Sequence, residues 1–460
     1  PHGSGNTKLI SDLCVTMAKE LGLRYRQEAC NNVIIWKDAS AGYENAAPVI
    51  LQGHMDMVCA QTEDCAKDMT REGLDLATDG NYVWAEKTSL GGDDCIAVAA
   101  AFAILADNSL PHPPLEVVIT VDEETGMDGA VALDCSDLKG RRLLNLDSEE
   151  EGVFTVGCAG GLRADCLLPA EKQPLHGEKV FAVTISGLRG GHSGAEIDKG
   201  RASANTLMGR VLYTAMERLG SLRIAGLRGG QFDNVICPRC DAVVAVPAGK
   251  EEEFSSFVRD FSGIMKNEYA VTDPDVTLCA AAAHADSAYS EAASERMLHV
   301  LLALPQGVQV MSADLPGLVQ TSLNLGVMDG LDDGLHISFS IRSSVASQKE
   351  MVLQRVRSIV EYAGGQVVTH GDYPAWQYAR QSPLRDTVMA AYRRLTGREG
   401  VVMATHGGLE CGLLISKMPG LDAVSLGPEL HDIHSPRERL GVASVGRMYE
   451  LVCEVLKNCR

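Results

Sequence analysis

Short apolar runs alternate with amphipathic or alanine-rich segments over the first third of the chain, a pattern typical of an α/β sheet domain. The apolar run 49–52 follows a proline and predicts a buried strand that ends in Gly-His-Met-Asp. Two more runs, 115–121 and 143–146, predict strands that end in Asp-Glu-Glu-Thr-Gly and Asp-Ser-Glu. The alanine-rich segment 95–106 predicts a buried helix. Because histidine and acidic residues follow all three strands, we expect one functional edge of the sheet.

The pattern changes after the glycine pair at 160–161. Here the order strand, helix, strand pair, helix, strand is typical of a ferredoxin-like fold. Its predicted elements are 180–186, 205–219, 234–246, 252–266 and 276–282. The order partly recurs in the helix 295–304, the strands 320–326 and 336–342, the helix 348–363 and the strand 366–369. We therefore predict an inserted α+β domain, residues 160–372, with two similar ferredoxin-like halves.

The alternating pattern resumes after residue 372. Its predicted elements are the helices 383–395, 409–415 and 442–457 and the strands 400–404 and 423–426. They would complete the first sheet, so residues 1–159 and 373–460 form one discontinuous domain. The length of 460 residues agrees with two domains, since single hydrophobic cores stop growing at about 250–300 residues.

Composition excludes some classes of partner. The net charge of −20 argues against nucleic acid or an anionic membrane, because both would repel the average surface. The 14 cysteines are scattered, and only Cys237 and Cys240 form a close pair, without the second pair that a zinc ribbon needs. Many unpaired thiols are typical of the reducing cytoplasm, where we expect this protein. The longest strongly apolar segment, 96–105, is too short to cross a bilayer.

Histidine and acidic side chains at the ends of these elements are candidates for a metal site. The candidate ligands are His54, Asp93, Glu124, Asp147 and His434. Taken singly, each could be a helix cap or a surface charge, but their joint placement favours a site. Two imidazoles with three carboxylates suit Zn²⁺, and also Co²⁺ or Mn²⁺. Residues two apart in a strand face the same side, so Asp56 shares a space with His54.

The neighbour of Glu124 is a candidate catalytic group. Glu123 and Glu124 stand in the turn Asp-Glu-Glu-Thr-Gly, which lets one side chain bind metal while the other faces substrate. A free carboxylate beside a metal site is the expected general base of a metallohydrolase. Taken alone, the same residues could be a solvated acidic loop.

Seven motifs together resemble one metallopeptidase family. They are Gly53-His54-Met55-Asp56, Gly91-Gly92-Asp93-Asp94, Asp122-Glu123-Glu124-Thr125-Gly126, Asp147-Ser148-Glu149, Gly190-Gly191-His192-Ser193-Gly194, His406-Gly407-Gly408-Leu409-Glu410-Cys411-Gly412 and His434-Ser435-Pro436. The family includes aminoacylase, carboxypeptidase G-type enzymes and carnosine dipeptidases, and the last three motifs are most similar to its aminoacyl-histidine dipeptidase branch. The resemblance spans nearly the whole chain. It implies a mixed-sheet zinc-peptidase catalytic domain, made of both outer segments, with the inserted domain as a lid.

The resemblance also implies a role for each metal-site residue. Asp93 would bridge two zinc ions, with His54 and Asp147 completing one site and Glu124 and His434 the other. Asp56 would orient His54 and raise its basicity as a ligand. Glu123 would take a proton from the attacking water and later give it to the leaving amine.

Further residues would bind the substrate. The resemblance implies that His192 stabilises the oxyanion and that Asn234 contacts substrate. Arg342 would hold the substrate carboxylate through its two-pronged guanidinium group. His406 and Gly407 could contact substrate as well, or they could form a strand-to-helix turn with Glu410 capping nearby.

The bridging position departs from the usual family sequence. The branch commonly has Gly-Ala-Asp-Asn-Gly where this chain has Gly91-Gly92-Asp93-Asp94-Cys95. Position favours Asp93 as the bridge, and Asp94 is the alternative. The peptide bond after the bridging aspartate is cis in this family, so we predict a cis Asp93–Asp94 bond.

The resulting functional hypothesis is a dinuclear-zinc dipeptidase that cleaves Xaa-His and other aminoacyl–amino acid bonds. Its partner would be a small peptide with a free carboxyl terminus. The first alternative is a deacylase of N-acyl amino acids with the same chemistry. A non-catalytic binding protein is the second, but it would be expected to lack a ligand or Glu123. The protein would be a monomer or a homodimer, depending on whether His192 acts within its own chain.

Overall fold

Two separate hydrophobic cores organise the chain, one in each of two structural units of the computed structural model, which describes residues 1–460. Unit 1 consists of Pro1–Cys158, Trp376–Thr405 and Leu409–Arg460. Unit 2 consists of Ala159–Ala375 and His406–Gly408. The sequence predicts that the short segment His406–Gly408 belongs with the outer segments instead. It groups with unit 2 because the Gly407 carbonyl accepts a hydrogen bond from the Ala159 N–H, at 3.0 Å.

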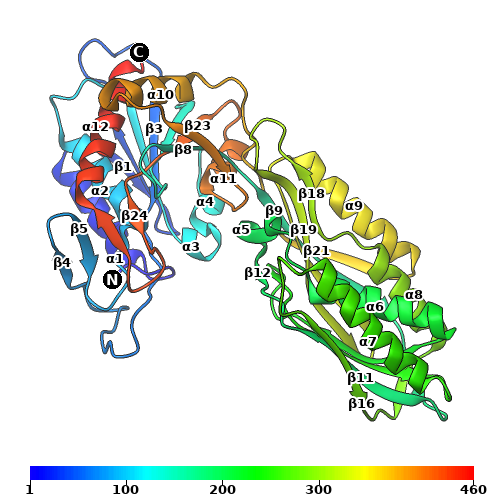
Figure 1. Ribbon diagram of the computed structural model, residues 1–460. Helices are drawn as coiled ribbons and strands as arrows, with labels where there is room; N and C mark the ends of the chain where they lie inside the picture. Colours follow the sequence, from blue (N-terminus) through cyan, green and yellow to red (C-terminus); the bar gives the residue numbers. More distant parts are fainter. The chain divides into compact units, whose positions relative to one another are not determined.

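Unit 1 is built on an eight-stranded mixed sheet (Figure 1). Its strands, in spatial order, are β1 (Arg24–Gln27), β2 (Val33–Lys37), β6 (Leu115–Thr120), β3 (Val49–His54), β7 (Arg142–Asn145), β23 (Asp422–Ser425), β8 (Val153–Cys158) and β22 (Val401–Thr405). The central strands β6, β3, β7 and β23 run parallel. β3 and β6 are buried along their whole length, which is why they are continuous apolar runs rather than alternating ones.

Helices cover both faces of this sheet (Figure 1). On one face, α2 (Gly92–Ala106) and α10 (Pro383–Thr396) contact α12 (Val442–Asn458); on the other, α4 (Asp128–Ala132) contacts α11 (Glu410–Lys417). The first helix of the chain, α1 (Lys8–Glu20), packs on β1 and β2. None of the helices combines the length and the apolar character needed to cross a membrane.

Unit 1 also contains a small four-stranded sheet. Its strands are β4 (Leu76–Thr78), β5 (Tyr82–Ala85), β25 (Arg439–Gly441) and β24 (Leu430–His431). β4 and β5 form a hairpin, and β25 pairs antiparallel with β5. The pairing brings the segment around residue 434 next to the loop that precedes α2.

Unit 2 contains two halves with the same topology, joined in one antiparallel sheet (Figure 1). One half consists of β11 (Lys179–Ser186), α6 (Ala204–Leu219), β13 (Arg223–Gly229), β15 (Cys240–Val246), α7 (Glu251–Glu268) and β16 (Thr277–Ala282). The other consists of β9 (Gly160–Pro169), α8 (Glu291–Ala303), β19 (Val319–Leu331), β20 (Gly334–Ser343), α9 (Ala346–Tyr362) and β21 (Gln366–Tyr373). In each half the fourth strand lies beside the first, followed by the third and the second. Both halves therefore have the predicted ferredoxin-like order, and the fold class is confirmed.

Two strands of unit 2 differ from the prediction. The first strand of the predicted pair at 234–246 is instead Arg223–Gly229, and only the short β14 (Val235–Ile236) lies near Asn234. The first strand of the second half, β9, precedes the whole first half, so one half is inserted into the other. The glycines that obscured β9 have a packing role: a Cβ on Gly160 would lie 2.6 Å from the Tyr373 carbonyl oxygen of β21.

Candidate metal centre

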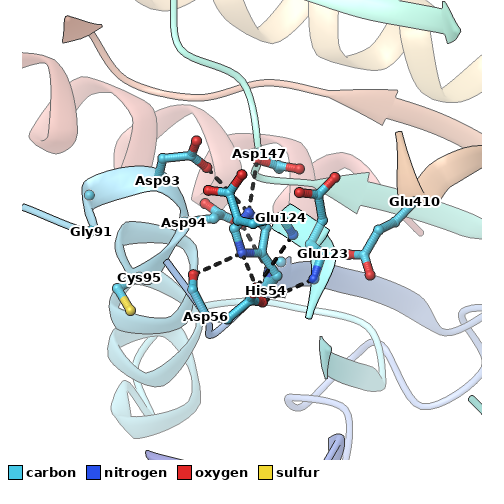
Figure 2. Close-up of polar contacts among 12 residues, drawn as sticks. His54, Asp56, Gly91, Asp93, Asp94, Cys95, Glu123, Glu124, Asp147 and Glu410 are labelled. Atoms are coloured by element: carbon cyan, nitrogen blue, oxygen red, sulfur yellow. Dashed lines mark hydrogen bonds and ion pairs between the residues drawn. The ribbon is translucent and has the colours of Figure 1, made fainter. Parts of the chain in front are cut away.

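The carboxyl ends of three parallel strands supply most of the candidate site. β3 ends at His54, β6 leads into the short helix α3 (Glu123–Gly126), and β7 leads to Asp147. The start of α2 adds Asp93, and the segment after β24 adds His434. Figure 2 shows the acidic side chains from these separate elements converging on the ring of His54.

Asp93 lies between the two histidines. Its Oδ1 is 3.2 Å from Nε2 of His54, and its Oδ2 is 3.1 Å from Nε2 of His434. Asp147 Oδ1 is 3.6 Å from the same nitrogen of His54, and Glu124 Oε2 is 2.9 Å from that of His434. The five predicted ligands therefore converge, with Asp93 offering one oxygen to each half of the cluster.

The electrostatics of this cluster fit divalent cations. Burial raises the pKa of Asp147 to about 6, and burial followed by the charge of Asp147 raises the pKa of Glu123 to about 9. Oε1 of Glu124 is buried and has no hydrogen-bond partner. Crowded, buried carboxylates need cations to stay ionised, and carboxylate with imidazole is a donor set that zinc accepts.

The neighbouring carboxylates also raise the pKa values of the two histidines. Hydrogen bonds to Asp93 and Glu124 raise the pKa of His434 to about 10. Burial disfavours the charged form of His54, yet the Asp147 carboxylate outweighs it and raises the pKa of His54 well above its usual value. Without metal, the carboxylates therefore favour protonated imidazoles. A ligating imidazole must be neutral, so a bound cation would take the place of the proton on each ring.

Asp56 holds both the first histidine and the Glu123–Glu124 turn. Nδ1 of His54 is 3.0 Å from the backbone oxygen of Asp56, which can only accept, so Nε2 is left for a ligand role. The Asp56 carboxylate accepts hydrogen bonds from the backbone N–H of Glu123, at 3.1 Å, and from Oγ of Ser4, at 2.7 Å. One buried carboxylate thus links three segments around the site.

The two neighbouring aspartates have different surroundings. The peptide bond between Asp93 and Asp94 is cis, which confirms the prediction. Whereas Asp93 faces both histidines, Asp94 accepts a hydrogen bond from the backbone N–H of His54, at 3.2 Å. Asp94 also belongs to a second possible ligand group with His54 and Asp147. Its Oδ1 is buried without a hydrogen-bond partner, and burial raises its pKa well above the usual value.

Glu438 is a site residue that the sequence analysis missed. Its buried carboxylate accepts hydrogen bonds from four successive backbone N–H groups, those of Leu90, Gly91, Gly92 and Asp93, at 2.8, 3.0, 2.7 and 3.3 Å. Glu438 therefore ties the loop that presents Asp93 to the segment that presents His434. In the sequence it stands between two arginines and resembles an exposed charge run, so only its spacing of four residues from His434 hinted at a role.

Removal of the Glu438 carboxylate is expected to loosen this loop. Glu438→Ala leaves four buried donors without an acceptor, so we expect the free energy of unfolding to fall by about 2–4 kcal/mol. Zinc affinity should fall about 10–100-fold, as is usual when a residue that supports metal ligands is lost. Denaturant unfolding and zinc titration of the metal-free protein measure the two effects. Arg437→Ala, at the exposed neighbour, is the matched control; equal zinc affinity in both variants would contradict the role.

Unit 2 gathers the residues predicted to bind substrate. β12 (Gly191–His192) pairs with β14, and the Asn234 carbonyl accepts a hydrogen bond from the Ser193 N–H at 2.8 Å, so Asn234 lies next to His192. A Cβ on Gly194 would meet the ring of His192 at 2.8 Å and Cζ of Arg342 at 3.3 Å. The glycine in Gly-His-Ser-Gly thus lets the imidazole and the guanidinium share one small space.

Arg342 and His406, in the same unit, each have one buried side-chain nitrogen without a hydrogen-bond partner. Nη1 of Arg342 donates to the Tyr373 hydroxyl at 3.1 Å, while its Nε is buried without a partner. His406 Nε2 is 2.7 Å from Oγ of Ser322, and its Nδ1 is buried without a partner. Burial and the charge of Arg342 lower the pKa of His406 to about 4, and the same two causes lower that of His192. Both imidazoles are therefore held neutral.

Glu410 does not cap α11, which was one alternative from the sequence. The N-cap of this helix, Leu409, makes no side-chain hydrogen bond, and the Glu410 side chain is fully buried. Oε2 of Glu410 instead accepts hydrogen bonds from Thr120 and Gln52 of the central strands.

Comparison with known proteins identifies the family. Residues 50–458 match peptidase family M20/M25/M40. The chain is 38% identical to the cytosol non-specific dipeptidase of Escherichia coli, covering 100% of this chain and 95% of that protein. It superposes on the aminoacylhistidine dipeptidase of Vibrio alginolyticus with a TM-score of 0.94 and 34% identity, covering 100% and 94% of the two chains. Aminopeptidase PepT from Bacillus cereus shares the fold, with a TM-score of 0.57 and 15% identity over 100% and 94% of the chains. The sequence resemblance is therefore confirmed, and this chain belongs to peptidase family M20/M25/M40.

Proposed function

We propose that this protein is a metal-dependent dipeptidase that hydrolyses Xaa-His and other dipeptides. The observation that carries the proposal is the convergence of His54, Asp93, Glu124, Asp147 and His434, with the half-buried Glu123 beside them. Two relatives that match over the whole chain, at 38% and 34% identity, are named dipeptidases. A non-catalytic role is disfavoured because every ligand and the candidate base are present.

The metal sites would hold two divalent cations. We propose zinc, because its usual donors are imidazole and carboxylate, with cobalt or manganese as substitutes. His54 and Asp147 would hold one cation, Glu124 and His434 the other, and Asp93 would contact both. When bound, such a pair polarises a peptide carbonyl and makes water more acidic.

Glu123 is the candidate for the proton transfers of the reaction. It is not one of the converging ligands, and partial burial followed by the charge of Asp147 raises its pKa, so its carboxylate binds a proton more strongly than an ordinary glutamate does. We propose that it accepts a proton from the attacking water and returns that proton to the leaving amine. One carboxyl group would thereby serve as general base and then as general acid.

Substrate binding would use the side chains of unit 2. The unpartnered Nε of Arg342 supports a role in binding the substrate carboxylate, which guanidinium groups bind through two parallel hydrogen bonds. His192, held neutral, would donate a hydrogen bond to the oxyanion. Asn234, His406 and Gly407 would contact the peptide.

A hydrolysis panel tests the function. We expect Ala-His and carnosine to be cleaved, activity to vanish after chelation and to return with zinc, cobalt or manganese. Ala-His with an amidated carboxyl terminus should be cleaved at least about 10-fold more slowly, because it lacks the charge that Arg342 would bind. Cleavage of N-acetyl amino acids alone would contradict the proposal and identify a deacylase. A protein that cleaves neither class would be the non-catalytic alternative.

We also propose a cytoplasmic location and a monomeric or homodimeric state. The location is supported by the 14 cysteines, all free in the structure, and by the printed name of the Escherichia coli relative. Light scattering on the purified protein distinguishes the two oligomeric states.

A further inference from the structure

A buried polar network lies next to the candidate metal centre, and Glu410 is its only ionisable member. Oε2 of Glu410 accepts a hydrogen bond from Nε2 of Gln52, at 2.5 Å, and another from Oγ1 of Thr120, at 2.7 Å. Oε1 of Gln52 in turn accepts from Nδ2 of Asn145, at 2.6 Å. All four side chains are buried, with exposed fractions of 1% or less. Burial of polar side chains is costly unless they form hydrogen bonds with one another, so the loss of one member should disturb the others.

The three strand residues of this network precede residues of the candidate site by two or three positions in the sequence. Gln52 precedes His54 by two residues on β3. Asn145 is the last residue of β7 and precedes Asp147 by two residues. Thr120 is the last residue of β6, three before Glu123. Because residues two apart in a strand face the same side, Gln52 points the same way as His54. Figure 2 shows Glu410 beside Glu123, close to the ligand cluster.

We infer that Glu410 is a positioning residue that holds the ends of β3 and β6, and through Gln52 that of β7, at the spacing the metal centre needs. Strand β3 lies between β6 and β7 and is paired with both by backbone hydrogen bonds. Those bonds fix the register of the strands, but the pairing stops at His54 with Thr120 and at Gln52 with Asn145. At these last pairs the side-chain network adds links between Gln52, Thr120 and Asn145, which precede His54, Glu123 and Asp147 by two or three residues.

The chemistry of the network calls for an acceptor at Glu410 rather than a charge. Both hydrogen bonds end on Oε2, and Oε1 is buried with no partner. Burial raises the pKa of Glu410 to about 7, so a neutral carboxyl group is accessible near neutral pH. Glutamine has the same shape and keeps one carbonyl oxygen as acceptor, so it should preserve the connection, whereas alanine removes it.

The test compares Glu410→Gln and Glu410→Ala with the parent protein. Zinc affinity of the metal-free protein is measured by titration, and kcat and KM are measured on Ala-His, so the kinetic arm rests on the proposed function. For Glu410→Ala we expect zinc affinity to fall about 10–100-fold and kcat to fall by a similar factor with KM within about threefold. Glu410→Gln should restore both to within about threefold of the parent. Cys411→Ala, at the next buried position of α11, is the control for helix packing and should match the parent.

A second variant keeps the test decisive if Glu410→Ala does not fold. Thr120→Val removes one donor to Glu410 and retains the side-chain shape, and it should also weaken zinc binding. The inference is overturned if both Glu410→Ala and Thr120→Val bind zinc as the parent does, or if Glu410→Gln is as damaging as Glu410→Ala. If the parent protein binds zinc but cleaves no dipeptide, the proposed function is refuted instead. The zinc affinities of the variants would still test the role of Glu410.

Discussion

Glu123→Gln is expected to lower kcat on Ala-His by about 10²–10⁴-fold, the usual contribution of a general base. Glutamine occupies the same volume but cannot take a proton from water or return one to the leaving amine. The substitution spares the backbone N–H that Glu123 donates to Asp56, so the turn that also carries Glu124 should keep its place. The ligand groups contain Glu124 but not Glu123, and the metal content should therefore remain that of the parent.

Steady-state kinetics and elemental analysis on the same preparation separate these two effects. Glu150→Gln, at an exposed acidic residue after Asp147, serves as the control and should retain full activity. Hydrolysis by Glu123→Gln at the rate of the parent would refute the assignment. A loss of metal together with activity would assign Glu123 to the ligands instead.

The convergence of the candidate ligands was predictable in part because the carboxyl ends of parallel strands meet at one edge of a sheet. The runs before His54, Glu123 and Asp147 are apolar and short, so their ends could be located to within a residue or two. Asp93 and His434 follow no strand of this sheet, so their positions at element ends were a weaker signal than those of the other three candidates. Position in the motif favoured Asp93 over Asp94, and the different contacts of the two carboxylates separate them in the structure.

The residues that support the centre were not predictable. Glu438 acts on a loop 345 residues earlier in the chain, and Glu410 contacts Gln52 across 358 residues. No local pattern marks such contacts, because hydrophobic periodicity reports which face of an element is buried and not what a polar residue meets there. Glu438 stands in a charge run and Glu410 at a helix start, where exposed glutamates are common.

The topology of unit 2 was recovered only in part for a related reason. Its helices are amphipathic and were located well, whereas β9 and β13 contain glycine and polar residues that interrupt the strand pattern. The interruption reflects packing: Gly229, at the end of β13, lies against Asn205, where a Cβ would clash with the side chain. β9 is difficult to recognise for a further reason, because the strands that pair with it follow at least 165 residues later, the separation of Pro169 and Gly334.

Separate substitutions of Asp93 and Asp94 by asparagine test which of the two aspartates is a metal ligand. Asp93→Asn is expected to reduce zinc affinity by more than about 100-fold, since a ligand should matter more than the residues that support ligands. Asp93 offers one oxygen to each histidine, and an asparagine retains a single oxygen without charge. Asp94→Asn keeps an oxygen that can accept the hydrogen bond from the His54 backbone, so its zinc affinity should stay within about 10-fold of the parent.

Metal stoichiometry gives the clearest measurement for this pair. With Asp93 as the shared ligand, the parent and Asp94→Asn should bind two zinc ions per chain, whereas Asp93→Asn should lose both tight sites, because each half of the cluster depends on one of its oxygens. Circular dichroism of both variants checks that neither substitution has unfolded the protein. Two tight ions in Asp93→Asn together with their loss in Asp94→Asn would assign the bridge to Asp94. That assignment would place the bridging carboxylate in the group formed with His54 and Asp147, away from His434.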